Sequence, residues 1–92
     1  MKIRVTAFGQ IKRYIENYCG EISLPDDARL ADLLHYIDYH WSKEFPEYIW
    51  NKNKKQFRGP VVIMVGNQAI TDHDTLLCDG QEVKLYKVLV GG

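Results

Sequence analysis

The chain has 92 residues and a formal net charge of zero at pH 7, because 12 basic side chains balance 12 acidic ones. This length predicts one domain, residues 1–92, and leaves no room for a pair of catalytic domains. Zero net charge disfavours general binding to nucleic acids or acidic membranes, since both select a basic excess. The chain starts without an apolar signal-peptide core and has no apolar run near the roughly 20 residues that span a bilayer, so we expect a cytoplasmic protein.

The first segments predict two paired strands with a short helix between them. Residues 2–8 alternate between polar and apolar side chains, which is the period of a half-buried strand. Residues 10–20 place apolar side chains at helical spacing and end at Gly20, a common helix stop. Residues 21–25 form a short second strand, which we expect to pair with the first.

The main helix is predicted over residues 26–41. Asp26 or Asp27 can cap its start, and Asp32 lies in the first turn, where a carboxylate is favourable. Apolar side chains recur at the spacing of one helix face, namely Leu30, Leu33, Leu34, Ile37 and Trp41. This stripe predicts a helix that packs on a sheet.

The second half of the chain predicts three more strands. Residues 61–65 are apolar at every position, which indicates a strand that is buried on both faces or lies at the sheet centre. Residues 68–70 follow a turn and form a short edge strand. Residues 81–90 form the last strand, with Val83 and Leu85 on its inner face.

Residues 42–60, between the main helix and these strands, mix aromatic and basic side chains. We expect a loop with one turn of helix near residues 46–50. The basic stretch at residues 51–58 could contact RNA or a phosphate-bearing ligand. In a chain of zero net charge, a solvated loop is the preferred interpretation.

The order of these elements predicts an α+β fold. A strand pair, a crossover helix and further strands make a mixed sheet packed on one main helix. This is the ubiquitin-like β-grasp arrangement, here with an extra short helix after the first strand and a flexible C-terminal end.

Thiol and imidazole side chains give little sign of a metal or redox site. Cys19 and Cys78 lie far apart and lack CxxC spacing, so two buried, unpaired thiols in a reducing compartment are favoured over one long-range disulfide. His35, His40 and His73 lack the i, i+4 spacing of a helical metal site, and we expect them on the surface.

No motif nominates an autonomous active site. Asp26 and Asp27 fit a helix start, and Asp72 and Asp74 fit a turn, better than they fit an acid–base pair. The sequence has no GxSxG, P-loop or GxGxxG motif. Whether the protein is an enzyme therefore stays open, and any catalysis would need machinery from a partner.

The last residues carry the most specific signal. Val88, Leu89 and Val90 are consecutive, so strand alternation cannot place all three in the core, and some of their surface should contact a partner. Gly91 and Gly92 follow directly, and glycine backbone passes close to pocket walls that a side chain would strike. We call residues 88–92 the tail.

The reactive group at such a tail would be the terminal carboxylate of Gly92. A carboxylate is a poor electrophile, and ATP-dependent adenylation by another protein would convert it into an acyl-adenylate. Attack by a sulfur nucleophile would then give a thiocarboxylate, which is a soft nucleophile for the same reason as a thiolate. Attack by a lysine would instead give a protein conjugate.

Four segments in order resemble the MoaD/ThiS family of sulfur carriers, and most closely the small subunit of molybdopterin synthase. They are "IRVTAFGQIKRYI", "LPDDARLADLL", "VVIMVGNQAI" and "LCDGQEVKLYKVLVGG". The resemblance covers nearly the whole chain. The length and the first helix favour the molybdopterin branch over shorter thiamine-type carriers, although the segment before the glycines lacks the prolines often found in that branch.

The resemblance implies that Gly92 is adenylated and then thiocarboxylated by an activating enzyme of the ubiquitin-activating type, which uses ATP. The carrier itself would bind no cofactor or metal. Its thiocarboxylate would enter the large subunit of a synthase, in a heterotetramer, and donate sulfur for the molybdenum or tungsten cofactor. Gly91 would provide clearance, and the docking residues would be Tyr86, Val88, Leu89 and Val90.

Three other functions remain open at this stage. The chain could carry sulfur for thiamine or another metabolite. It could be a ubiquitin-like modifier that is conjugated to lysines through Gly92, or a β-grasp interaction module whose glycines have no chemistry.

Overall fold

The structure, a computed structural model, describes residues 1–15, 19–59 and 61–87. Its main sheet has five strands in the order β2-β1-β7-β5-β6. Their bounds are β1 Lys2–Ala7, β2 Cys19–Ser23, β5 Val61–Val65, β6 Gln68–Ala69 and β7 Glu82–Lys87. A second sheet pairs β3 Trp50–Asn51 with β4 Gln56–Phe57. The helices are α1 Leu30–His40 and the 3-10 turns η1 Gly9–Arg13 and η2 Ser42–Glu44.

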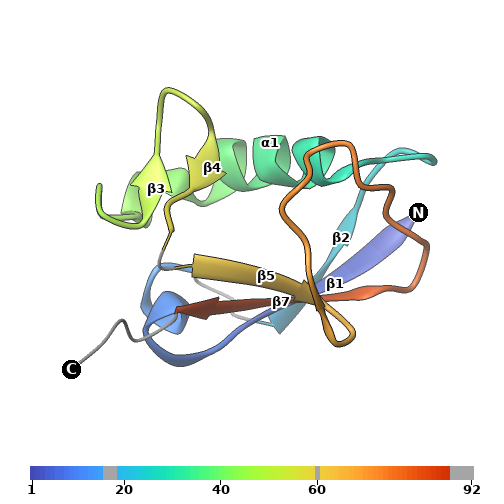
Figure 1. Ribbon diagram of the computed structural model, residues 1–92, viewed down its shortest axis with the longest axis horizontal. Helices are drawn as coiled ribbons and strands as arrows, with labels where there is room; N and C mark the ends of the chain where they lie inside the picture. The colour runs from blue at the N-terminus through green and yellow to red at the C-terminus, as the bar shows by residue number, and fades with distance from the viewer. Residues whose placement is uncertain (16–18, 60, 88–92) are drawn as a thin grey trace.

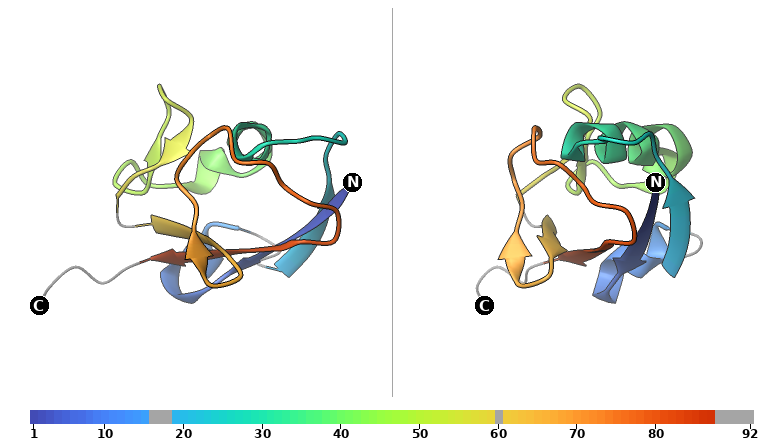
Figure 2. Two further views of the ribbon diagram at one scale, coloured as in Figure 1. Left: turned by 45° about the vertical axis from the view of Figure 1, so that its right-hand side comes forward. Right: turned by 90° about the vertical axis from the view of Figure 1, so that its right-hand side faces the viewer.

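The helix α1 crosses one face of the main sheet, and the β3–β4 hairpin lies on that same face beyond the end of α1 (Figures 1 and 2). Because a mixed sheet is covered on one side by one main helix, the predicted ubiquitin-like β-grasp fold is confirmed. None of the helices in the described ranges is long and apolar enough to cross a membrane.

The strand β7 occupies the centre of the main sheet. It pairs in parallel with β1, with Val5 opposite Val83, and antiparallel with β5, with Ile63 opposite Leu85. Val83 and Leu85 are both fully buried, as their predicted inner-face positions require. The first strand also pairs antiparallel with β2, as predicted.

The core forms between α1 and this sheet. From the sheet, the side chains of Ile3, Val5 and Ala7 are at most 2% exposed, and from the helix Leu33 and Ile37 are fully buried. Alternation along the strands and the i, i+4 spacing along the helix therefore meet on one apolar layer. Full burial of each large side chain stabilises the fold by about 1.5–3 kcal/mol.

The start of α1 differs from the prediction that Asp26 or Asp27 caps it. Arg29 precedes the first helical turn, and the Asp32 carboxylate accepts a hydrogen bond of 2.8 Å from the Arg29 backbone N–H. A β-bridge to Leu76 holds Arg29 extended, so the helix cannot begin earlier. Asp27 instead lies in a turn with φ of 65°.

The predicted short helix after the first strand is present, but it is a 3-10 helix over Gly9–Arg13 and is shorter than the predicted residues 10–20. Residues 16–18 lie outside the described residues. Gly20 is not a helix stop but a strand residue, opposite Val5 in the β1–β2 ladder. Residues 19 and 20 form a strand despite the helical spacing of the apolar residues before them, because pairing with β1 satisfies their backbone N–H and C=O groups with hydrogen bonds.

The predicted loop at residues 42–60 is instead partly core. It contains the 3-10 turn η2, and the turn of helix expected near residues 46–50 is also present, since the Ile49 and Trp50 N–H groups donate to the Pro46 carbonyl at 3.0 and 3.1 Å. Phe45, Trp50 and Phe57 are 0–9% exposed, and the Trp50 and Phe57 rings meet edge to face at 4.8 Å. We call these three residues the aromatic cluster. The Trp50 Nε1 donates a hydrogen bond to the Asp38 carboxylate on α1 at 3.2 Å, which ties the β3–β4 hairpin to the helix.

The strand at residues 61–65 forms as predicted but does not lie at the sheet centre. It is β5, next to the edge strand β6, and only Val61 and Ile63 are buried. Its outward-facing side chains are half-buried rather than covered on both faces. The predicted edge strand at residues 68–70 is confirmed as β6.

Replacing Trp50 with alanine should lower the free energy of unfolding by about 3–5 kcal/mol, because it empties the centre of the aromatic cluster. Equilibrium denaturation with urea measures the change. The exposed Tyr39, at 80% accessibility, supplies the matched control, and Tyr39→Ala should cost less than about 0.5 kcal/mol. If Trp50→Ala leaves no folded protein, Trp50→Phe tests the same point with a smaller loss; equal effects at the two positions would contradict the cluster.

Candidate docking site at the end of β7

The candidate site is the surface around the end of β7. Lys87, the last residue of this strand, pairs with Val61, and the Phe8 N–H donates a hydrogen bond of 2.9 Å to the Leu85 carbonyl. The strand is therefore held on both sides close to its end. Of the docking residues predicted from the sequence, Tyr86 is described, whereas Val88, Leu89, Val90, Gly91 and Gly92 lie outside the described residues.

Tyr86 lies on the sheet face opposite α1, because its neighbours on either side along β7, Leu85 and Lys87, point to the other face. Its ring stacks on Phe8 with centroids 4.7 Å apart and planes 6° from parallel, and the side chain is 36% exposed. Val62 lies opposite Tyr86 on β5 and is half-buried. Together they make a partly exposed apolar surface.

The helix-side face of the same strand end carries two tyrosines and a lysine. The hydroxyls of Tyr14 and Tyr48 lie 3.4 Å apart, and the Lys87 ammonium lies 5.2 Å from the centre of the Tyr48 ring. Tyr14 also meets Phe45 edge to face at 6.4 Å. These contacts come from η1, the segment before β3, and β7, so they bind three distant segments to one place.

The hydrogen bond between the Tyr14 and Tyr48 hydroxyls is the main cause that raises the pKa of Tyr14 above its ordinary value. Nearby positive charges on Arg13 and Lys87 act in the opposite direction. The Tyr14 hydroxyl therefore stays protonated at neutral pH and acts as a hydrogen-bonding group. We call Phe8, Tyr14, Tyr48, Tyr86 and Lys87 the β7-end cluster.

The β7-end cluster combines aromatic rings, two hydrogen-bonded hydroxyl groups and one ammonium group. Over residues 1–15, 19–59 and 61–87, no three His, Cys, Asp or Glu side chains gather as a metal site. His35, His40 and His73 are exposed, as predicted. Aromatic side chains with polar ends are the residues most enriched at the centres of protein interfaces.

Cys78 is exposed, which corrects the prediction of a buried thiol. Its neighbour Leu77 takes the buried position, at 5% exposure, and the Cys78 N–H donates to the Gln81 side chain at 3.0 Å. The side chain of Cys19 lies outside the described residues.

Sequence reasoning missed three members of the β7-end cluster. Phe8 continues the outward face of β1, so its parity would have placed it beside Tyr86 once the parallel pairing was known. Tyr14 and Tyr48 carry no local signal, because they meet only through the fold.

Comparison with known structures adds the fold's relatives. SAMP1 from Haloferax volcanii, also described as small archaeal modifier protein 1, superposes with a TM-score of 0.78 at 13% identity, over 100% of both chains. A candidate molybdopterin converting factor subunit 1 from Pyrococcus furiosus gives 0.73 at 25% identity, over 97% of this chain and 99% of that one.

A third neighbour is a chain of the complex between subunits 1 and 2 of the molybdopterin-converting factor from Helicobacter pylori, with a TM-score of 0.67 at 22% identity over 100% of both chains. No protein-family model matches the chain, and no curated protein sequence matches it. The structural neighbours nevertheless confirm the resemblance to MoaD/ThiS-type proteins that the four sequence segments indicate.

The stack between Phe8 and Tyr86 should be measurable as a coupling in stability. In a double-mutant cycle with Phe8→Ala, Tyr86→Ala and the double variant, we expect a coupling free energy of about 0.5–1.5 kcal/mol, because stacked aromatic pairs stabilise beyond their buried area. Urea denaturation of the four proteins provides the values. The pair Phe8→Ala with Tyr39→Ala is the control and should be additive; a coupling near zero for Phe8 and Tyr86 would contradict the stack.

Proposed function

We propose that this protein is a sulfur carrier whose reactive group is the C-terminal carboxylate of Gly92. In the proposed cycle, a partner enzyme joins this carboxylate to the α-phosphorus of ATP and releases pyrophosphate. Sulfide then attacks the carbonyl carbon of the acyl-adenylate, AMP leaves, and loss of a proton gives the thiocarboxylate. The thiocarboxylate is the donor in a synthase that builds the molybdenum or tungsten cofactor.

The observation that carries this proposal is the placement of β7. The strand that leads to the two glycines is the central strand of the sheet, and it is paired as far as Lys87. The tail can extend at most about 18 Å beyond Lys87, since a chain spans about 3.6 Å per residue. A rigid body with a short glycine-ended extension suits delivery of one group into a narrow active site in another protein.

The β7-end cluster supplies the matching docking surface in this proposal. Tyr86, Phe8 and Tyr48 place aromatic area next to the point where the tail begins. The partner in the donation step would be a synthase large subunit, in a heterotetramer. Support comes from the Helicobacter pylori neighbour, which is a complex of subunits 1 and 2 of a molybdopterin-converting factor.

A second candidate function is covalent attachment to other proteins. SAMP1, the neighbour with a TM-score of 0.78, is described as a small archaeal modifier protein. Both functions share the adenylation step and diverge at the nucleophile, which is sulfur for a carrier and a lysine amine for a modifier. A carrier for thiamine or another metabolite would differ only in the receiving synthase.

Intact-mass measurement of the protein purified with its activating enzyme, ATP and a sulfur source tests the proposal. We expect the chain to end at Gly92 and to gain the mass difference between sulfur and oxygen. Omitting ATP is the control and should leave the mass unchanged. A ladder of heavier lysine conjugates with no sulfur gain would favour the modifier.

Deleting Gly92, or adding one residue after it, should abolish sulfur transfer to the synthase while leaving stability unchanged within about 0.5 kcal/mol. The reason is that the change moves the carboxylate without touching the paired part of β7. Product formation by the reconstituted synthase and urea denaturation are the two measurements. Normal product formation by the shortened chain would rule out Gly92 as the donor.

A further inference from the structure

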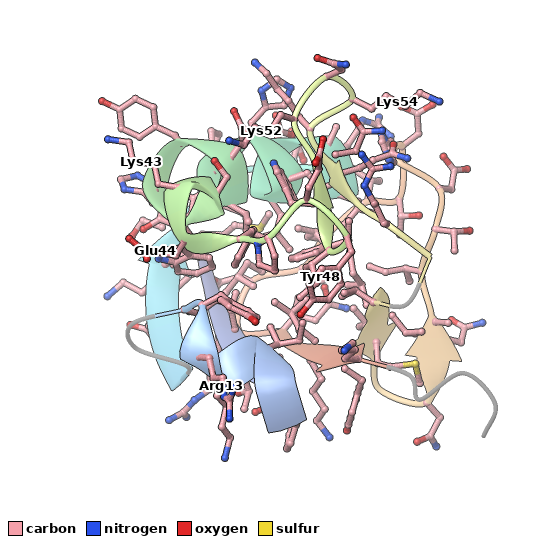
Figure 3. The ribbon with its side chains drawn as sticks, turned by 90° about the vertical axis from the view of Figure 1, so that its left-hand side faces the viewer. Arg13, Lys43, Glu44, Tyr48, Lys52 and Lys54 are labelled. Carbon is pink, nitrogen blue, oxygen red and sulfur yellow. The ribbon has the colours of Figure 1, made fainter. Side chains whose placement is uncertain are left out.

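The charges of this neutral chain are separated along its long axis. Seen from the end of the molecule where β7 stops, Arg13, Lys43, Lys52 and Lys54 surround Tyr48, with Glu44 among them (Figure 3). Two further basic residues contact the segment that carries Tyr48, since the Arg58 Nε donates to the Glu47 carbonyl and the Lys87 ammonium lies over the Tyr48 ring.

The opposite end carries much of the balancing negative charge. Asp26 lies 3.3 Å from the N-terminal amine, and Asp79 accepts a hydrogen bond of 2.7 Å from the Lys2 N–H, so both lie beside the N-terminus at the other end of the long axis (Figure 1). Asp72 and Asp74 lie in the exposed loop that covers the start of α1, where the Asp74 carbonyl accepts from Arg29.

The net charge of the whole chain therefore does not describe the electrostatic interaction with a partner that contacts one end of it. The molecule measures 39 Å along its long axis, whereas charges in physiological salt are screened beyond a Debye length of about 8 Å. A partner at the β7 end interacts with the basic residues there and hardly at all with the distant aspartates. For such a partner the protein behaves as a basic one.

The β3–β4 hairpin presents part of this charge on a rigid support. The Asn51 side-chain oxygen accepts hydrogen bonds of 3.0 Å from the N–H groups of Asn53 and Lys54, which closes the turn that carries the lysines. Trp50 and Phe57 anchor its two strands in the aromatic cluster. The fold therefore holds the backbone that carries these lysines, so this backbone loses less conformational freedom on binding than an unstructured loop would.

We propose that the partner surface that receives the tail has an acidic rim, and that the basic residues around the β7-end cluster steer it onto that cluster. This inference rests on the proposed function and adds the chemistry of the partner. On this protein, the centre of the interface would be aromatic, at Tyr48, which is 53% exposed. The rim of the interface would be charged and would include Lys52 and Lys54. An apolar centre with a polar rim is the usual anatomy of a protein interface, and complementary charge mainly raises the association rate.

A protein surface fits this face better than a nucleic acid does. Single-stranded nucleic acids stack their bases on open aromatic rings. Here one face of Tyr48 is covered by Lys87, and its hydroxyl pairs with Tyr14.

The test compares two charge reversals that change the net charge equally, Lys54→Glu at the β7 end and Lys2→Glu at the far end. Lys2 is exposed, and its ion pair with Glu21 (3.6 Å) is exposed too and contributes at most about 1 kcal/mol, so the fold should tolerate the charge reversal. Association of each variant with the purified activating enzyme and with the purified synthase large subunit is followed by stopped flow at several salt concentrations. Urea denaturation confirms that both variants are folded.

At low salt we expect Lys54→Glu to lower the association rate constant with either partner about three- to tenfold, and Lys2→Glu to change it less than about twofold. The difference should vanish near 1 M salt, where the Debye length is about 3 Å. Equal effects of the two variants, or no dependence on salt, would overturn the acidic rim.

Two further arms separate the remaining outcomes. Binding of a single-stranded RNA oligonucleotide that is lost in Lys54→Glu, with unchanged protein association, would overturn the inference in favour of a nucleic acid. Intact mass of the wild-type protein in the same reactions reports the proposed function. Sulfur gain with association insensitive to Lys54→Glu refutes the rim alone, whereas no sulfur gain and no association with either protein refutes both.

Discussion

The parallel pairing of β1 with β7 is the constraint on which the rest of the structure depends. It places the last described strand between the first strand and β5, with Val83 and Leu85 fully buried under α1. Because β7 runs away from the N-terminus, its end at Lys87 lies beside residues from η1 and from the segment before β3. The β7-end cluster forms at this place because β7 ends there, and the basic residues of Figure 3 lie around the same strand end.

Local periodicity predicted the parts of the fold whose side chains face one shared core. Alternation placed Val83 and Leu85 on the inner face of β7, and the helical stripe through Leu33 and Ile37 identified the face of α1 that is buried. These successes share one cause, since spacing along the chain reports burial directly when an element packs on a single layer.

The errors also share a cause, because they involve contacts that distant segments decide. Trp50 looks like part of a polar loop until its ring meets Phe57 and its Nε1 reaches Asp38 on α1. In the sequence, Gly20 resembles the residue that ends a helix, but in the structure it pairs with Val5 of β1 as a strand residue. The sequence also does not reveal the separation of basic and acidic side chains, because Arg13 and Lys54 lie at the same end of the molecule only in the folded chain.

The central position of β7 also sets the order in which the molecule can be completed. During synthesis, β1, β2, α1 and β5 emerge before residue 82, yet β1 and β5 have no direct partner in each other and must wait for β7 to join them. Such long-range parallel pairing forms late, and until then the apolar face of the sheet lacks its middle. A chain cut short before this strand would stay unfolded and be open to proteolysis. Only chains that include β7 could therefore complete the main sheet, and shorter chains would be removed by proteolysis.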